Sequence, residues 1–221
     1  MKKISAVIFD MDGLLIDTEV PSQLAWKSAV AQLGKSIDDE VLLGLIGCHI
    51  DDWIATLGEH FEMDLKEVNF LKMYDDIYLS NFMRNGIDVK RGVIPLLNSL
   101  AEKMVPRAVA TSSEKHLAPR KLRLAGLEQY FDLIVTGCEV AKSKPEPDIY
   151  LLAAEKLGVD PAECLVFEDS HNGIRAAHRA GMNPVMIPDL LKPTAEIEEL
   201  TTGIFSSLEE AEPLLFDLLE I

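Results

Sequence analysis

The chain has 221 residues, of which 48% are hydrophobic and 26% are charged, so it can bury a sizeable core without disulfide or metal cross-links. Its 37 acidic and 21 basic side chains give a net charge of −16, which argues against a nucleic-acid partner because phosphate backbones would be repelled. Cys48, Cys138 and Cys164 form no C-x-x-C pair, and no apolar run has the length of a signal-peptide core or a membrane span, so we expect a cytoplasmic protein with reduced thiols and no membrane partner.

The first predicted element is a buried strand in the segment VIFDMDGLLIDTE, residues 7–19, which ends in Asp10 and Asp12. Two like charges at the edge of an apolar core cost free energy unless a metal or hydrogen bonds compensate them. A calcium-binding loop would need an oxygen ligand at its fifth position, where this chain has Leu14. Taken alone, the pair of acids could equally cap the following turn or take part in catalysis.

Residues 18–88 show helical patterns only. Trp26, Val30 and Leu33 recur at helical spacing in its first part, and Phe70 and Tyr74 do so in its last part. We expect a small helical bundle here, inserted after the first strand.

From about residue 92 the pattern changes to alternating helices and short apolar strands. Helices are expected at 92–103, with Ile94, Leu97 and Leu100 on one face, and at 114–125, 147–158 and 172–181. Strands are expected at 106–113, 131–137, 164–170 and 183–188. This alternation predicts βαβ units and an α/β fold with a Rossmann-like parallel sheet flanked by helices. The predicted domains are an α/β core of residues 1–17 and 89–221 and a helical domain of residues 18–88.

Polar side chains follow the ends of the predicted strands, where open parallel sheets bind ligands. They are Asp10 and Asp12 after the first strand, Thr111, Ser112 and Ser113 after the second, Lys142 and Lys144 after the third, and Glu168, Asp169 and Ser170 after the fourth. Carboxylates suit Mg²⁺, while hydroxyl, amide and lysine donors suit a phosphate. Because neighbours in a strand face opposite sides, we expect one of Glu168 and Asp169 to reach a metal only through water.

This set of groups predicts phosphate chemistry. A carboxylate of Asp10 could attack phosphorus once a metal offsets the charge repulsion, and Asp12 could protonate the leaving oxygen and then deprotonate water. Thr111, with Ser112 beside it, and a lysine could hold the phosphate oxygens.

Four motifs occur in the order that the haloacid dehalogenase superfamily requires: DMDGLLIDT, ATSS, KSKPEPD and VFEDS. The chain therefore resembles the aspartate-nucleophile phosphotransferases of that superfamily, and its motif style is similar to β-phosphoglucomutase-like sugar-phosphate phosphatases. The resemblance implies a helical cap over an α/β core. It also implies that Asp10 is the nucleophile, Asp12 the acid and base, and Thr111 and Lys144, not Lys142, the phosphate ligands. It assigns Mg²⁺ to Asp10, the Asp12 carbonyl, Glu168 and Asp169.

The resemblance leaves the phosphate acceptor open. β-Phosphoglucomutases carry a histidine and an arginine in the cap, where we place Ser22 and Ile50, although His49 is adjacent. These departures favour water as acceptor, hence a phosphatase of a small phosphorylated metabolite; a phosphosugar mutase is the alternative. A non-catalytic binding protein on the same fold is a second alternative. The sequence does not fix the oligomeric state, and a monomer is favoured.

Overall fold

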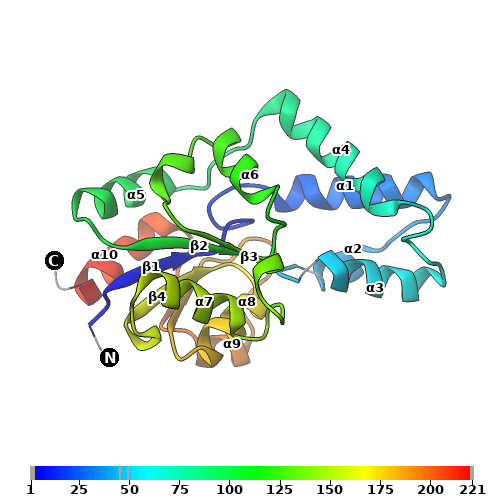
Figure 1. The fold of residues 1–221 in the computed structure, drawn as a ribbon. Helices are drawn as coiled ribbons and strands as arrows, with labels where there is room; N and C mark the ends of the chain where they lie inside the picture. Colours follow the sequence, from blue (N-terminus) through cyan, green and yellow to red (C-terminus); the bar gives the residue numbers. More distant parts are fainter. Residues whose placement is uncertain (1–2, 45, 49, 220–221) are drawn as a thin grey trace.

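The computed structural model describes residues 3–44, 46–48 and 50–219, and it contains a six-stranded sheet (Figure 1). The strand order is β3-β2-β1-β4-β5-β6, and each pairing is parallel. The strands are β1 (Ala6–Phe9), β2 (Arg107–Thr111), β3 (Ile134–Thr136), β4 (Cys164–Glu168), β5 (Asn183–Met186) and β6 (Gly203–Ile204). The predicted α/β class with a parallel sheet is confirmed. The strand order reverses between β1 and β4, which is where doubly wound sheets bind ligands.

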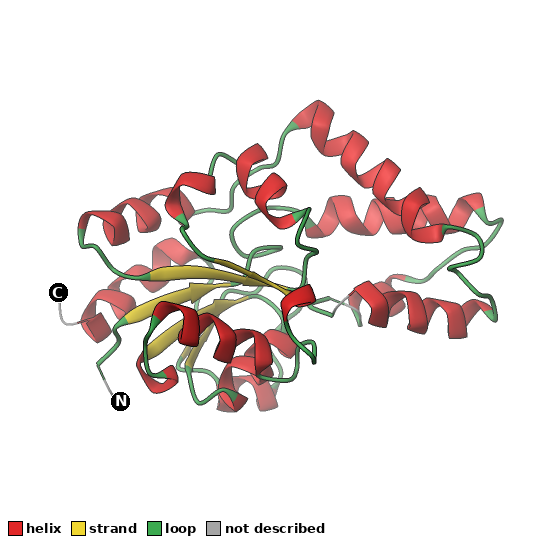
Figure 2. Cartoon of the chain, viewed as in Figure 1, coloured by secondary structure: helices red, strands yellow, loops and turns green. Residues whose placement is uncertain are grey.

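Helices cover both faces of this sheet (Figure 2). On one face, Val7 and Phe9 pack in the same cluster as residues of α5 (Val93–Glu102), α6 (Ala118–Leu124) and α10 (Leu208–Leu219). On the other, Ala6 and Ile8 pack with α7 (Asp148–Leu157) and α8 (His171–Arg179), and α9 (Ala195–Leu200) lies against α8. Successive residues of β1 therefore serve opposite layers, as the two-residue period of a strand requires.

Two sequence expectations about helices need correction. The helix expected at 114–125 begins only at Ala118, because Glu114 starts a turn and Pro119, which lacks an N–H, occupies the first helical turn. Ile94 is 37% exposed, whereas Val93 and Leu96 are buried, so the buried face of α5 is rotated from the expected one. The elements α9, β6 and α10 were not predicted.

Residues 18–88, called here the helical segment, contain α1 (Glu19–Gln32), α2 (Asp39–Leu43), α3 (Ile50–Phe61) and α4 (Phe70–Asn85). This agrees with the helical patterns of the sequence. Figure 1 shows the four helices extending away from the sheet on the side opposite the chain termini. Within the described ranges, no helix has the length and apolar character needed to cross a membrane. Cys48, Cys138 and Cys164 are free thiols.

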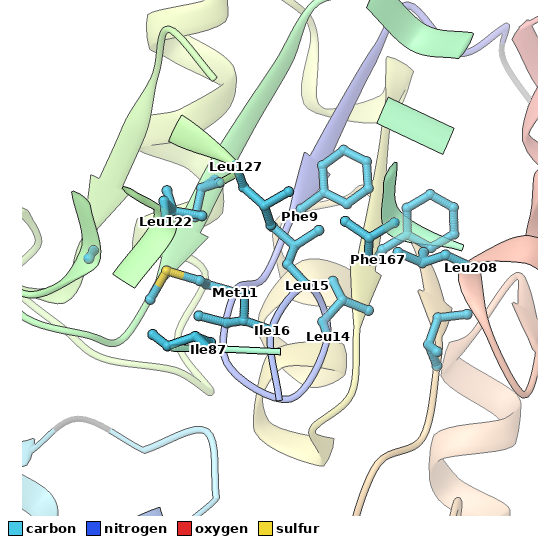
Figure 3. Close-up of a cluster of buried hydrophobic side chains, with 14 of the residues drawn as sticks. Phe9, Met11, Leu14, Leu15, Ile16, Ile87, Leu122, Leu127, Phe167 and Leu208 are labelled. Carbon is cyan, nitrogen blue, oxygen red and sulfur yellow. The ribbon is translucent and has the colours of Figure 1, made fainter. Parts of the chain in front are cut away.

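The chain crosses between the sheet and the helical segment twice, and the two crossings pair with each other. Ile16 forms an antiparallel bridge with Val89, and the Asp17 N–H donates to the Asp88 carbonyl at 2.8 Å. The loop after β1 is largely buried, and its Ile16 lies close to Ile87 of the return crossing (Figure 3).

Lys90 adds a charged contact at these crossings. Its Nζ lies 3.5 Å from an Asp17 oxygen and 2.6 Å from an oxygen of Asp189, in the loop after β5. The return crossing is thereby tied both to the outgoing crossing and to the sheet.

Candidate active site

A cavity of about 120 Å³ lies between the carboxyl ends of the strands and the helical segment. Five of the seven predicted site residues line it, namely Asp10, Asp12, Thr111, Ser112 and Asp169. The other two, Lys144 and Glu168, are almost fully buried directly beside Asp10. The structure thus brings together residues that the sequence spreads over about 160 positions.

Asp10 follows β1 and is 7% exposed. One of its carboxylate oxygens accepts a hydrogen bond from Lys144 Nζ at 2.6 Å. Burial raises the pKa of Asp10 to about 7; Lys144 opposes this rise, and the nearby Glu168 adds to it. The buried Asp10 carboxylate is therefore held at the sheet edge by a hydrogen bond from one lysine.

Lys144 joins three strands through its ammonium group. Its Nζ donates to Asp10 Oδ1, to Glu168 Oε1 at 2.8 Å and to the Ala110 carbonyl at 3.2 Å. Burial alone would lower the pKa of Lys144, but the carboxylates of Asp10 and Glu168 raise it well above its usual value. Lys142 is exposed, whereas Lys144 is buried beside Asp10, so the structure separates the two lysines as the family motif does.

Asp12 has a separate set of partners. Its Oδ1 accepts from Thr18 Oγ1 at 2.6 Å and from Lys121 Nζ at 2.8 Å, and its Oδ2 accepts from Ser113 Oγ at 2.7 Å. Burial would raise the pKa of Asp12, but the charge of Lys121 and these hydrogen bonds lower it below its usual value. Although the two aspartates belong to one motif, the pKa of Asp10 is raised and the pKa of Asp12 is lowered.

Sequence reasoning missed Lys121 altogether and expected Thr18 only to fix the loop after Asp12 and to start the helical segment. Lys121 is 7% exposed in α6 and belongs to no motif, so no sequence pattern distinguishes it from a surface lysine. Thr18 does stand before α1, but its hydroxyl makes no capping hydrogen bond and instead contacts Asp12.

Asp10, Glu168 and Asp169 form a cluster in which one oxygen of each lies within 4.8 Å of the others. Because β4 ends at Glu168, the alternation of strand side chains does not extend to Asp169, and both residues join the cluster. Their surroundings differ. Glu168 accepts from Lys144 and Tyr150 at Oε1 and from the N–H and hydroxyl of Ser170 at Oε2.

Asp169 lines the cavity, and burial, followed by the charges of Glu168 and Asp10, raises its pKa well above its usual value. Three carboxylates with so little cationic compensation fit a hard divalent cation, with Asp10 and Asp169 as the ligands least engaged elsewhere. Gly13 has φ +80°, and a Cβ there would lie 2.4 Å from Asp169 Oδ2, so only glycine lets the loop pass this carboxylate.

Thr111 and Ser112 lie where β2 ends. Thr111 is 1% exposed, and its Oγ1 accepts from the Ser113 N–H at 3.0 Å. Ser112 Oγ donates to the Gly47 carbonyl of the helical segment at 3.1 Å. Ser112 therefore contacts the opposite wall of the cavity in this arrangement.

The chain is similar in sequence and in fold to several known proteins. Residues 7–187 match the haloacid dehalogenase-like hydrolase family. The chain belongs to this family. A probable pseudouridine-5′-phosphatase of Drosophila melanogaster is 34% identical over 226 residues, covering 99% of this chain and 96% of the relative. A phosphorylated carbohydrates phosphatase of Thermotoga maritima is 35% identical over 182 residues, covering 82% and 84%. A solved structure of a putative β-phosphoglucomutase from Thermotoga maritima has a TM-score of 0.77 at 31% identity, covering 97% and 99%.

The helical segment of this hydrolase supplies the rest of the cavity wall. Ser22 and Ile50 both line it, and Ser22 Oγ lies 3.0 Å from the Tyr74 hydroxyl. His49 lies outside the described residues. Glu19, at the start of α1, also lines the cavity; burial, then the charge of Asp12, raises its pKa to about 8.

Proposed function

We propose that this hydrolase is a magnesium-dependent phosphatase of a small phosphorylated metabolite, a sugar phosphate or similar monophosphate, acting through a phosphorylated Asp10. The observation that carries the proposal is that the two aspartates lining one cavity have different partners. Asp10 contacts Lys144 and lies in a cluster with two further carboxylates. Asp12 accepts hydrogen bonds from Lys121, Thr18 and Ser113. The family match and the phosphatases among its relatives support this reading.

In the first step an oxygen of Asp10 attacks phosphorus, and the bond from phosphorus to the ester oxygen breaks. Protonated Asp12 gives its proton to that leaving oxygen; an arriving phosphate dianion raises the pKa of Asp12 and so favours the protonated form. In the second step water attacks phosphorus, Asp12 takes the proton of the water, and the bond to Asp10 breaks to release inorganic phosphate.

We assign Mg²⁺ to Asp10, Asp169 and the backbone carbonyl of Asp12, with Glu168 as the fourth member of the set. When bound, the cation offsets the repulsion between the Asp10 carboxylate and the phosphate. Lys144 holds Asp10 and Glu168 in place and would bind phosphate only by exchanging one of its three hydrogen bonds. Thr111 and Ser112, at the cavity wall, would bind the phosphate oxygens that are not transferred.

We further propose that residues 18–88 act as a cap domain on a core of residues 1–17 and 89–221, and that water is the phosphate acceptor. Ser22 and Ile50 support water, because neither offers the cationic or imidazole group that a mutase would use on its sugar phosphate. The putative β-phosphoglucomutase among the similar structures keeps the mutase as the second candidate.

The test is release of inorganic phosphate from p-nitrophenyl phosphate with MgCl₂ and with EDTA. We expect magnesium-dependent release that Asp10→Asn abolishes and that Asp64→Asn, an exposed acid on the helical segment, leaves unchanged. Full activity of Asp10→Asn would overturn the mechanism, and no release from wild type would favour a binding protein. Conversion of β-glucose 1-phosphate to glucose 6-phosphate without matching free phosphate would instead establish the mutase.

A further inference from the structure

The helical side of the cavity is built from aromatic rings. Trp53 stacks on Trp26 at 4.4 Å between ring centroids, Trp26 on Tyr74 at 4.1 Å, and Tyr74 on Tyr78 at 5.2 Å. All four rings line the cavity, together with the aliphatic Ile46, Ile50 and Leu71. Trp53 and Tyr74 are each 8% exposed while Trp26 is 1% exposed, so Trp53 and Tyr74 are the rings best placed to touch a bound molecule.

The ionisable carboxyl and amino groups that line the described part of this cavity are almost all acidic. Among the described lining residues six are acidic, namely Asp10, Asp12, Glu19, Asp75, Glu114 and Asp169, and one is basic. That one, Lys121, donates to Asp12 and Ser113 and lies 5.1 Å from the ring centroid of Tyr78. Lys121 is therefore already paired with Asp12, the proposed acid and base. The described part of the helical segment that lines the cavity has no lysine or arginine to bind a second anionic group.

We propose that this cavity selects monophosphate esters whose leaving group is uncharged and presents a flat or apolar face to Trp53 and Tyr74, and that it rejects a leaving group with a second phosphate. An anion placed against apolar rings and carboxylates loses its water without gaining a partner. A heterocycle or the C–H face of a sugar ring instead gains contact with the aromatic wall. The inference rests on the proposed phosphatase function and specifies its substrate class.

Binding can be measured without turnover. Trp26 and Trp53 are the two tryptophans of the chain and both line the cavity, so intrinsic tryptophan fluorescence reports directly on its contents. We would titrate the Asp10→Asn variant, with MgCl₂ present, with uridine 5′-monophosphate, fructose 6-phosphate and fructose 1,6-bisphosphate, and take affinities from calorimetry.

We expect both monophosphates to change the emission, and the better of them to bind at least about tenfold more tightly than the bisphosphate, since an unpaired charge in a binding site costs more than one tenfold step. Stronger binding of the nucleotide would identify a heterocycle as the favoured face, and stronger binding of the hexose phosphate would identify a sugar ring. Equal or tighter binding of the bisphosphate, or no change in emission with either monophosphate, would overturn the proposal.

A charge-addition variant tests the same wall in the active protein. Ile50→Arg places a guanidinium inside the cavity, and Leu24→Arg adds the same charge on α1 at a position that is 54% exposed and outside the lining. We expect Ile50→Arg alone to shift the ratio of kcat/KM for fructose 1,6-bisphosphate over fructose 6-phosphate upward by about tenfold or more. An unchanged ratio would refute the inference, while magnesium-dependent release from p-nitrophenyl phosphate would leave the phosphatase function standing.

Discussion

The buried carboxylates predict that the stability of the metal-free protein falls as the pH rises. The pKa of Asp10 is about 7 in the fold, against an ordinary value of 3.8. Between these values the folded state keeps a proton that the unfolded state has lost, so each unit of pH lowers the free energy of unfolding. A rise of about three units, at ~1.4 kcal/mol per unit, corresponds to up to about 4 kcal/mol lost between about pH 4 and pH 7. Glu19 and Asp169 act in the same direction, because their pKa values are also raised.

A divalent cation should reverse this loss, because it binds the folded cluster of Asp10, Glu168 and Asp169 in preference to the unfolded chain. At a hundredfold excess over the Kd, ligand binding stabilises a fold by ~2.7 kcal/mol. In a chain of this length that corresponds to a Tm increase of roughly 5–10 °C. The increase should be much smaller at about pH 5, where a proton on Asp10 competes with the cation.

The assay is thermal unfolding followed by circular dichroism at about pH 5 and about pH 7.5, with EDTA or with MgCl₂. Asp169→Asn should raise the metal-free Tm at the higher pH, because it removes one of three mutually repelling carboxylates, and it should remove most of the MgCl₂ effect. Glu199→Gln, at an exposed position of α9, is the matched control and should behave as wild type. A MgCl₂ effect of equal size at both pH values, or one that Asp169→Asn retains, would refute the reasoning.

Three further predictions concern contacts that the motifs do not contain. Lys121→Met should raise the pKa of Asp12, which must be protonated in the first step, and so move the alkaline limb of the kcat/KM profile to higher pH by about one unit or more; an unmoved limb would contradict the role of this ion pair. Gly173→Ala should destabilise the protein by several kcal/mol in urea unfolding, since a Cβ there would lie 1.6 Å from Glu168 Oε1, and wild-type stability would show that this carboxylate moves freely. Lys90→Met, which removes both carboxylate contacts at the crossings, should lower the free energy of unfolding by about 1 kcal/mol, measured in the same way, and a loss below the error of the measurement would rule out a stabilising role.

The parts of the site that lie within short motifs could be predicted from the sequence. Asp10 and Asp12 end an apolar strand, and Glu168 and Asp169 end another, so a parallel sheet necessarily brings them to one edge. Lys144 was distinguished from Lys142 by its place before Pro145 in the family motif, and only Lys144 is buried beside Asp10. The roles of these residues in the reaction stay predictions.

The sequence by itself determined the α/β class, the helical character of residues 18–88 and the edge of the sheet at which the acids gather, because strand and helix periods and strand ends are local properties of the chain. Only the tertiary structure decided that Lys121 pairs with Asp12 and that Trp53 and Tyr74 face the same cavity as Asp10. Those contacts join residues from α3, α4 and α6 to the end of β1. They depend on how whole elements pack, and side-chain packing between elements leaves no repeat in the sequence from which it could be inferred.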